Sequence, residues 1–439
     1  MKIMKSKLIL LLFIAILLNG CANSEIISGY WTGSIGLNGK IVDLSVNLNS
    51  DKQTFSSNDL MLIEQPITNL KIDNGNISFS LILDVELNFK GELKNDQING
   101  TVEMQNGPQN MNMIFNLTKQ SITPEKLYSI ETLSIKSNNV VLSADIYKPH
   151  DDNLHPAIVL LHGSTSNYKT DYIFYADYFA KLGFEVLIFD KRGSGKSTGD
   201  YYLSSYDDLI ADAIACLETM YKRESVNKEK IGLWGLSQGA MLLPMIASKT
   251  TIPKYLIAIS PDVNSVTEAA AFSDSLRVVN SGGSELDGKI VAESHRKVEK
   301  MIREGNSHNE VEEFIRQNAQ KYSFMNQTGL YGNINIDKNE FKGFYWQGRI
   351  ENFLSLWGSL KIPTLVVFGG RDDLVDGERN ISILKSLNNE NIESKLFPKA
   401  NHILKKSFNP DIDAEFDFPR VIEGYTDTVE KWIKSEIEK

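Results

Sequence analysis

The chain has 439 residues, enough for two or three domains, and its charged fraction of 23% and hydrophobic fraction of 42% are those of an ordinary globular protein. Its net charge of −10, with no cluster of basic residues, argues against a nucleic-acid partner. Only two cysteines occur, so a disulfide framework is excluded.

The first 21 residues have the pattern of an export signal. A basic start, MKIMKSK, precedes the apolar run LILLLFIAILL and the tetrapeptide LNGC, which ends at Cys21. LNGC resembles the lipobox of bacterial lipoproteins, in which the cysteine is lipidated and becomes the new N-terminus, although Asn19 is unusual at its position. The alternative is an uncleaved anchor, but the apolar run is short for a spanning helix of roughly 20 residues. We expect an exported protein of the cell envelope, held at the membrane by lipid on Cys21, with Cys216 as a core residue.

Residues 26–118 alternate apolar with polar side chains in short runs, which is typical of β-strands. Asn-Gly dipeptides at 38–39, 74–75 and 99–100 favour hairpin turns between them. No stretch has helical periodicity, so we predict a small antiparallel barrel or sandwich. The opening WTG at 31–33 and the later FKGEL and INGTVE segments resemble the lipocalin-like β-domains found before some exported hydrolases. That resemblance implies a ligand-binding module or a stabilising spacer.

From residue 122 to residue 439, strands alternate with helices. Apolar strands such as AIVLLHGS and EVLIFD precede amphipathic stretches such as YIFYADYFAKLGF and YDDLIADAIACLETMYKR. Short, continuously apolar strands between helices indicate a mostly parallel sheet covered on both faces. Charged helices at about 262–345 interrupt the alternation, and we interpret them as a cap over the end of the sheet. The expected fold class is α/β, a doubly wound sheet with a helical cap, preceded by a small all-β domain.

The segment KRGSGKSTGD, residues 191–200, has to be tested as a nucleotide-binding loop. Such a loop needs G-x-x-x-x-G-K-[ST], whose first glycine lets backbone amides surround the phosphates. Counting back from the Gly-Lys-Ser at 195–197 places Asp190 at that first position. A carboxylate there has the wrong charge for phosphate, so we predict no nucleotide partner.

The segment Gly235-Leu236-Ser237-Gln238-Gly239 has the pattern G-x-S-x-G, between the strand KIGLW and the helix QGAMLLPMIAS. This strand–turn–helix context is that of a nucleophile elbow, in which two glycines leave room for a tight turn that presents the serine. We expect Ser237 to be the nucleophile, with Gly235 and Gly239 as the elbow glycines. The alternative is a serine that only caps a helix.

A serine nucleophile needs a base, and the base needs an acid that holds its tautomer. Of six histidines, His402 lies in a polar loop after the last predicted strand, where a triad base has to arrive. His295 and His308 lie on charged cap helices, and we expect them to be solvated. Asp372 and Asp373 follow the strand PTLVVFGG, which gives the chain order Ser, Asp, His. The spacing G-x-x-D-x-x-V around Asp372 resembles a signature of α/β-hydrolases, so Asp372 takes the role and Asp373 is the alternative.

The oxyanion of a tetrahedral intermediate needs backbone donors, and we expect them at Gln238 and at Ser164 in the LLHGS loop. These motifs together resemble the α/β-hydrolase superfamily over about 125–439. Residues 190–199 resemble the D-x-R-G-x-G-x-S-x-G element of its serine-aminopeptidase-like and dipeptidyl-peptidase-like branch. That resemblance implies a structural loop near the active site, which Arg192 would hold through hydrogen bonds to carbonyl oxygens.

Three functions follow from this resemblance. The first is a serine hydrolase that cleaves small carboxylic esters through an acyl-enzyme, with no metal or organic cofactor because the chain lacks clustered ligands. The second is an exported peptidase for short peptides, in which Glu310, Glu312 or Glu313 of the cap would hold the substrate amine. The third is a ligand-binding lipoprotein with an inert hydrolase domain. Ester cleavage is preferred because an alkoxide is expelled more easily than an amine and because the triad is complete.

Overall fold

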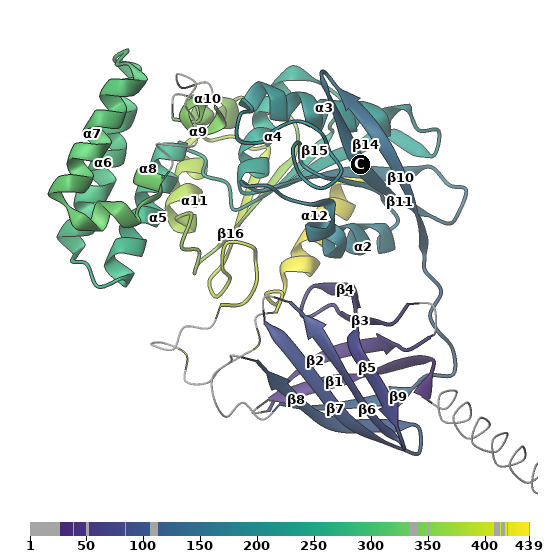
Figure 1. Cartoon of the computed structure of the whole chain (residues 1–439). Coiled ribbons are helices and arrows are strands. Elements are labelled where there is room, and N and C mark those ends of the chain that lie inside the picture. Colours follow the sequence, from purple (N-terminus) through teal and green to yellow (C-terminus); the bar gives the residue numbers. More distant parts are fainter. Residues whose placement is uncertain are drawn as a thin grey trace, which may run out of the picture. The chain divides into compact units, whose positions relative to one another are not determined.

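The computed structural model describes residues 27–438 except positions 38, 50–51, 84, 106–112, 333–340, 342, 350, 408–412, 414–417 and 419. The predicted signal segment, with Cys21, lies outside the described residues. The chain divides into two compact units, the β unit (Met1–Lys126 and Phe408–Val421) and the α/β unit (Leu127–Ser407 and Ile422–Lys439) (Figure 1). The sequence pattern assigns all residues after 122 to the second domain, whereas Phe418 packs in the core of the first unit. In the described ranges, no helix is long and apolar enough to cross a bilayer.

One antiparallel sheet makes up the described part of the β unit, in the order β4-β3-β2-β1-β9-β8-β7-β6-β5. Its strands are β1 (Tyr30–Leu37), β2 (Lys40–Asn47), β3 (Thr54–Ser57), β4 (Leu62–Pro66), β5 (Thr68–Asp73), β6 (Asn76–Ile82), β7 (Glu86–Lys94), β8 (Gln97–Met104) and β9 (Met113–Lys119). Alternate side chains enter a core in which Phe89 stacks on Phe79 at 4.5 Å between ring centroids and meets Phe115 edge-on at 5.3 Å. The sequence prediction of an antiparallel β-domain is confirmed.

Of the three predicted Asn-Gly turns, the one at 38–39 includes position 38, which lies outside the described residues, and of the other two one forms and one does not. The dipeptide at 74–75 joins β5 to β6, with positive φ at both positions. The dipeptide at 99–100 lies inside β8, so that prediction was wrong. The chain turns instead at Asn95 and Asp96, with φ of 50° and 59°. Gly100 is needed for close packing, because a Cβ there would lie 2.0 Å from a backbone oxygen of β7.

The sheet of the α/β unit has the strand order β10-β11-β13-β12-β14-β15-β16-β17. Its strands are β10 (Tyr128–Ser137), β11 (Val140–Pro149), β12 (His155–Leu161), β13 (Glu185–Phe189), β14 (Val226–Leu236), β15 (Tyr255–Ile259), β16 (Thr364–Gly369) and β17 (Ile392–Phe397). Strand β11 pairs antiparallel with both of its neighbours, β10 and β13. All other neighbouring strands, from β13 through β12 and β14 to β17, pair in parallel. The predicted mostly parallel sheet is therefore confirmed.

Helices cover both faces of this sheet, as expected for strands that are apolar throughout (Figure 1). They are η1 (Lys169–Tyr172), α2 (Ile173–Lys181), α3 (Tyr206–Lys222), α4 (Gln238–Lys249), α9 (Phe344–Gln347), α10 (Phe353–Gly358), α11 (Gly377–Ser386) and α12 (Tyr425–Ile437). Helices α3, α4 and α10 pack on one face in a common core, and α2 contacts α12 on the other. Because all the parallel strands point the same way, their carboxyl ends meet at one edge, where ligands bind in open α/β sheets.

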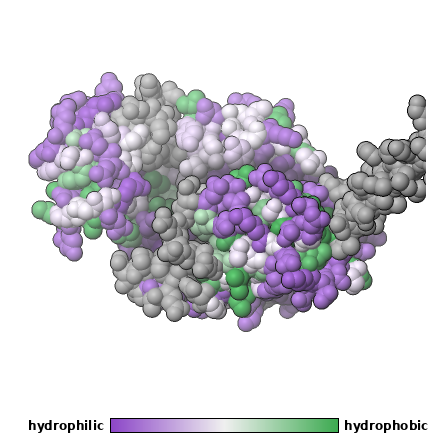
Figure 2. Space-filling model, turned by 60° about the horizontal axis from the view of Figure 1, so that its bottom comes forward, coloured by the Kyte–Doolittle hydropathy of each residue, from purple (hydrophilic) through white to green (hydrophobic). Residues whose placement is uncertain are grey.

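The interrupting segment forms the helices α5 (Val266–Asn280), α6 (Glu285–Arg303), α7 (His308–Lys321), η2 (Ser323–Gln327) and α8 (Gly329–Gly332). Their inward side chains make a separate hydrophobic cluster that includes Val291, Val298 and Ile315. The outer surface of α6 and α7, on the left of Figure 2, is predominantly hydrophilic. On the β unit in that view, hydrophobic residues are scattered among hydrophilic ones.

The prediction that His295 is solvated was wrong. Its side chain is 0% exposed, with Nε2 2.9 Å from Oδ2 of Asp274 and Nδ1 3.3 Å from the guanidinium of Arg349. His295 lies one turn from Val291 on the inner face of α6, a position that the many charges of this helix hide in the sequence. His308 is also largely buried, with 13% of its side chain exposed.

Candidate active site

The G-x-S-x-G segment forms a sharp turn between β14 and α4. Ser237 has φ of 52° and ψ of −115°, a strained conformation, and its N–H donates to the Ile259 oxygen of β15 at 2.8 Å. A Cβ on Gly235 would lie 2.6 Å from the backbone of Gly239, and a Cβ on Gly239 would lie 2.7 Å from the oxygens that end β12. Both positions therefore require glycine. Ser237 occupies the N-cap position of α4, but its side chain makes no capping hydrogen bond.

Asp372 and His402 lie next to each other beyond the carboxyl ends of β16 and β17. Nδ1 of His402 is 2.8 Å from Oδ2 of Asp372, and only 1% of the Asp372 side chain and 12% of the His402 side chain are exposed. The other carboxylate oxygen, Oδ1, accepts the N–H groups of Leu374 and Val375 at 2.8 and 2.9 Å. Asp373 is exposed and makes no such contact within the described residues.

The loop of His402 approaches the end of β16 closely, and the first glycine of the G-x-x-D-x-x-V segment explains how. A Cβ on Gly369 would lie 2.4 Å from the carbonyl oxygens of Ala400 and Asn401. Within the loop, the Asn401 side chain accepts the N–H groups of Ile403 and Lys405. The glycine thus lets the loop pack where His402 meets the carboxylate.

The two amides expected as oxyanion donors are not used elsewhere. In the part of the chain that the structure describes, neither the Ser164 N–H nor the Gln238 N–H donates a hydrogen bond. Gln238 is the first residue of α4, so its N–H belongs to the unsatisfied group at a helix start, where the helix dipole favours negative charge. Ser164, Gln238, Ser237 and His402 all line one cavity of about 330 Å³. No hydrogen bond joins Ser237 to His402 among the described residues.

The rest of this cavity is largely apolar. Small side chains of α5, including Ala269 and Ala270, form one wall, and three tyrosines, among them Tyr201, lie on another side. The described residues hold no group of three or more His, Cys, Asp or Glu side chains placed to bind a metal ion.

Sequence reasoning missed Asp262, a buried acid in this cavity. It follows β15 as Asp372 follows β16, and its Oδ1 accepts the N–H groups of Asn264 and Ser265 at 2.8 and 2.9 Å. Its Oδ2 accepts no hydrogen bond from the described chain. Burial raises the pKa of Asp262 to about 6, although the two N–H groups and the charge of Arg379 oppose that shift. An acid directly after a parallel strand is the signal that could have identified it.

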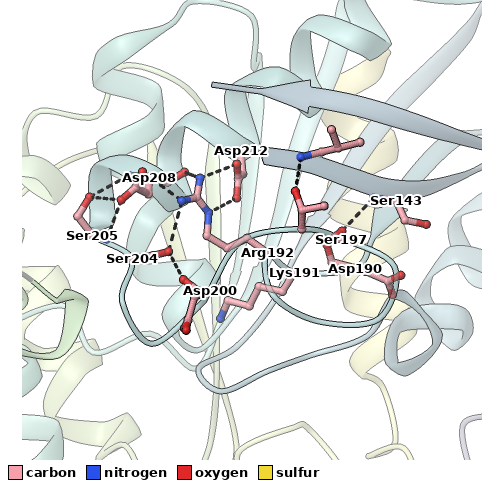
Figure 3. Close-up of polar contacts among 12 residues, drawn as sticks. Ser143, Asp190, Lys191, Arg192, Ser197, Asp200, Ser204, Ser205, Asp208 and Asp212 are labelled. Atoms are coloured by element: carbon pink, nitrogen blue, oxygen red, sulfur yellow. Dashed lines mark hydrogen bonds and ion pairs between the residues drawn. The ribbon is translucent and has the colours of Figure 1, made fainter. Parts of the chain in front are cut away.

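The segment 190–199 is a loop held by one carboxylate of its own and by carboxylates of α3. The Asp190 carboxylate accepts the backbone N–H groups of Lys169 and Lys196 at 2.9 and 3.0 Å, so a carboxylate takes the amides that a phosphate loop would leave open. Arg192 donates to both oxygens of Asp212 at 2.7 and 2.8 Å (Figure 3). It also reaches a carbonyl and the carboxylate of Asp208. The expected bonds to carbonyls are therefore a minor part of what holds Arg192.

His162, in the LLHGS loop, is buried with Nε2 2.5 Å from the Phe189 oxygen. Burial lowers the pKa of His162 to about 3, and the nearby Lys191 charge acts in the same direction. A histidine that stays neutral and bonded to a carbonyl holds the loop and is no candidate base.

A serine on a strained strand–helix turn, beside a buried carboxylate–histidine pair at the carboxyl edge of a mostly parallel sheet, defines an α/β-hydrolase. The family model described as Serine aminopeptidase, S33 matches residues 152–406, more than half of the chain. The chain belongs to this family and is therefore a hydrolase.

Individual relatives are more distant. Esterase EstD of Thermotoga maritima is 24% identical over 273 residues, which are 60% of this chain and 58% of that protein. An uncharacterized 31.7 kDa protein of Escherichia coli is 32% identical over 91 residues, which are 21% of this chain and 32% of that protein. The chain thus spans only part of the length of these curated relatives.

Two solved structures are also similar to this chain. An esterase of Pyrococcus furiosus is 20% identical, with a TM-score of 0.45, over 73% of this chain and 94% of its own. Est1E of Butyrivibrio proteoclasticus, in a structure with ferulic acid bound, is 17% identical, with a TM-score of 0.45, over 70% of this chain and 100% of its own.

Proposed function

We propose that the protein cleaves small carboxylic esters through an acyl-enzyme formed on Ser237. The observation that carries this proposal is the convergence on one cavity of the strained serine, the paired His402 and the two residues whose amides have no acceptor in the described chain. The name of the Thermotoga maritima relative, an esterase, supports the same substrate class.

The proposed reaction begins with attack of Ser237 Oγ on the ester carbonyl. The Nδ1–H of His402 donates a hydrogen bond to Oδ2 of Asp372, so Nε2 is free to accept the serine proton, and the carboxylate stabilises the imidazolium that results. The N–H groups of Ser164 and Gln238 receive the negative charge of the carbonyl oxygen. His402 then protonates the departing alcohol, and water cleaves the acyl-enzyme by the same steps in reverse order.

The cavity favours small substrates. Its volume of about 330 Å³ is at the lower end of the usual range of ligand pockets, and its walls are mostly apolar. An acyl group of a few carbons, or a compact aromatic one against the tyrosines, suits that size. A long acyl chain would have to extend out of the cavity.

The second candidate, a peptidase, is favoured by Asp262 and not by the cap glutamates. Glu310 caps its own helix through Ser307, Glu312 binds Arg316, and none of the three predicted glutamates lines the cavity. Asp262 does line it, with Oδ2 open to a ligand. A substrate ammonium could pair with that carboxylate, which would place an N-terminal amino acid in the cavity.

The discriminating experiment measures kcat/KM of the full chain, in mild detergent, on p-nitrophenyl esters of increasing acyl length and on aminoacyl p-nitroanilides. We expect turnover of short esters that Ser237→Ala abolishes. Anilide turnover of comparable efficiency, lost in Asp262→Asn while ester turnover remains, would favour the peptidase. Ester turnover that survives in Ser237→Ala refutes the mechanism, and no turnover of either series favours a ligand-binding protein with an inert hydrolase domain.

We also propose that the protein is exported and held at the cell envelope by lipid on Cys21. The support is the sequence pattern of the first 21 residues. Cells fed a labelled fatty acid should incorporate the label into the protein, and Cys21→Ala should remove it. Labelling that persists in Cys21→Ala would contradict the proposal.

A further inference from the structure

Lys191 lies buried behind the two amides of the candidate oxyanion site. Only 4% of the residue is exposed. Its ammonium donates to the carbonyl oxygen of Gly163 at 2.6 Å, to that of Thr165 at 3.2 Å and to Oε1 of Gln238 at 2.8 Å. It also lies 3.8 Å from the centre of the Tyr201 ring. All three N–H bonds of the ammonium are therefore used, and all three acceptors are neutral.

No carboxylate neutralises this cation in the described part of the chain. The next residue, Arg192, shows the contrast, because its guanidinium lies among the carboxylates of α3 while the Lys191 side chain runs apart from them (Figure 3). Asp212 shares a small cavity of about 20 Å³ with Lys191, but its two oxygens are bound by Arg192. A buried charge without a partner is costly, so its presence calls for an explanation.

Two of the contacts of Lys191 are with groups that contain the unused amides, namely the peptide unit between Gly163 and Ser164, and the residue Gln238. The Gly163 carbonyl and the Ser164 N–H belong to one peptide unit, and in a trans peptide these two groups point in opposite directions. A hydrogen bond that fixes the carbonyl therefore fixes the direction of the N–H, and it also polarises the unit so that the N–H is a better donor. The bond to the Gln238 side chain fixes the residue that provides the second N–H.

We propose that Lys191 is a positioning residue of the oxyanion site, whose ammonium orients both amide donors and whose charge is balanced only when the tetrahedral oxyanion forms. This inference rests on the proposed function, since it needs an acyl-enzyme reaction at Ser237. Lys191 does not touch the substrate. It acts through the Gly163–Ser164 peptide and through Gln238, and its unbalanced charge attracts negative charge that develops nearby in a site of low dielectric.

This role predicts a loss of rate without a loss of substrate binding. In Lys191→Met, which keeps an unbranched apolar side chain as far as Cε but has no charge or N–H, we expect kcat and kcat/KM on a short p-nitrophenyl ester to fall together by about tenfold to a hundredfold. Removing one oxyanion donor outright costs roughly a hundredfold to a thousandfold, so an indirect effect should be smaller. KM should remain within about twofold, because the ground-state carbonyl carries little charge.

Arg192→Lys is the matched control, since it changes the adjacent buried cation of the same loop. It should lower the melting temperature, because the bidentate contact with Asp212 is lost, yet leave kcat within about twofold. Equal losses of kcat in Lys191→Met and Arg192→Lys would show a general disturbance of the loop and would overturn the proposal.

The pH dependence gives a readout that a purely structural lysine would not produce. Burial lowers the pKa of Lys191 well below 10.5, so the ammonium is present below that lowered pKa and is lost as the pH rises through it. Wild-type kcat should therefore fall as the pH rises through this lowered pKa, and Lys191→Met should lack this fall. Burial lowers the pKa of His162 to about 3 and raises that of Tyr201 above its usual value, so neither of these neighbours accounts for the fall.

The outcomes separate this inference from the proposed function. If Ser237→Ala abolishes ester turnover but Lys191→Met keeps the wild-type kcat and the same fall of kcat with rising pH, the function stands and the role of Lys191 is refuted. If turnover survives in Ser237→Ala, both fail. If Lys191→Met does not fold, the pH dependence of wild-type kcat still tests the role. A wild-type kcat that stays constant up to the pH at which circular dichroism reports unfolding would refute it.

Discussion

Asp372→Asn tests the candidate triad with little disturbance of the fold. The oxygen of the introduced amide can still accept the N–H groups of Leu374 and Val375, which Oδ1 of the aspartate accepts at 2.8 and 2.9 Å. The amide nitrogen then takes the place of Oδ2, 2.8 Å from Nδ1 of His402. Because an amide nitrogen only donates, Nδ1 has to become the acceptor and the proton has to move to Nε2.

The cost follows from that change of tautomer. With its proton on Nε2, His402 cannot accept the proton of Ser237, and no carboxylate stabilises the imidazolium. A tautomer inverted in this way lowers kcat of serine hydrolases by about 10⁴-fold, which is roughly 5.5 kcal/mol of barrier. The melting temperature should change little, because both turn hydrogen bonds remain and no charge is left buried.

The assay is kcat and KM on a short p-nitrophenyl ester, beside thermal unfolding. Asp373→Asn is the matched control, since Asp373 is the adjacent acid, is exposed and makes no contact with His402 within the described residues. It should keep kcat within about twofold. The reasoning is refuted if Asp372→Asn retains more than a tenth of the wild-type kcat in folded protein, or if Asp373→Asn loses as much.

Two further predictions concern the elbow and the buried acid. In Gly239→Ala the new Cβ lies 2.7 Å from backbone oxygens, so kcat should fall at least about a hundredfold. Gly332→Ala, where a Cβ meets nothing within 4 Å, is the control and should keep full activity. Comparable kcat values in the two variants would contradict the role of Gly239 in packing. Burial raises the pKa of Asp262 from 3.8 to about 6. The protonated carboxyl therefore contributes fully to the free energy of unfolding below pH 3.8, and this contribution is lost as the pH rises through 6. The loss in the free energy of unfolding is at most roughly 3 kcal/mol. Asp262→Asn should therefore gain melting temperature relative to the wild type between pH 4 and pH 7, and a difference that does not change with pH would refute this.

The features that the sequence revealed are those encoded by neighbouring residues. The elbow is one continuous segment, in which the two glycines and the serine are fixed by a single turn. Asp372 follows its strand directly, and His402 follows the next one, so the parallel sheet brings both to one edge. Alternation of apolar and polar residues identified the strands of the β unit, and short continuous apolar runs identified those of the parallel sheet.

The features that the sequence concealed depend on contacts between distant segments. Burial of His295 results from Asp274, 21 residues earlier, and from Arg349, 54 residues later. Asp262 enters the cavity because β15 lies between the strands that precede Ser237 and Asp372, which is a matter of strand order. Local periodicity contains neither piece of information.

Lys191 and Arg192 illustrate this limit most sharply, because adjacent cations in one glycine-rich loop have opposite electrostatic surroundings. Arg192 is neutralised by Asp212, 20 residues later on α3. Within the described residues, Lys191 binds only neutral groups, which are the carbonyls of Gly163 and Thr165, 28 and 26 residues earlier, and the side chain of Gln238, 47 residues later. Because the described chain satisfies one cation with carboxylates and places none against its neighbour, a general need for positive charge in this loop does not account for Lys191. A transient negative charge at the adjacent amides does.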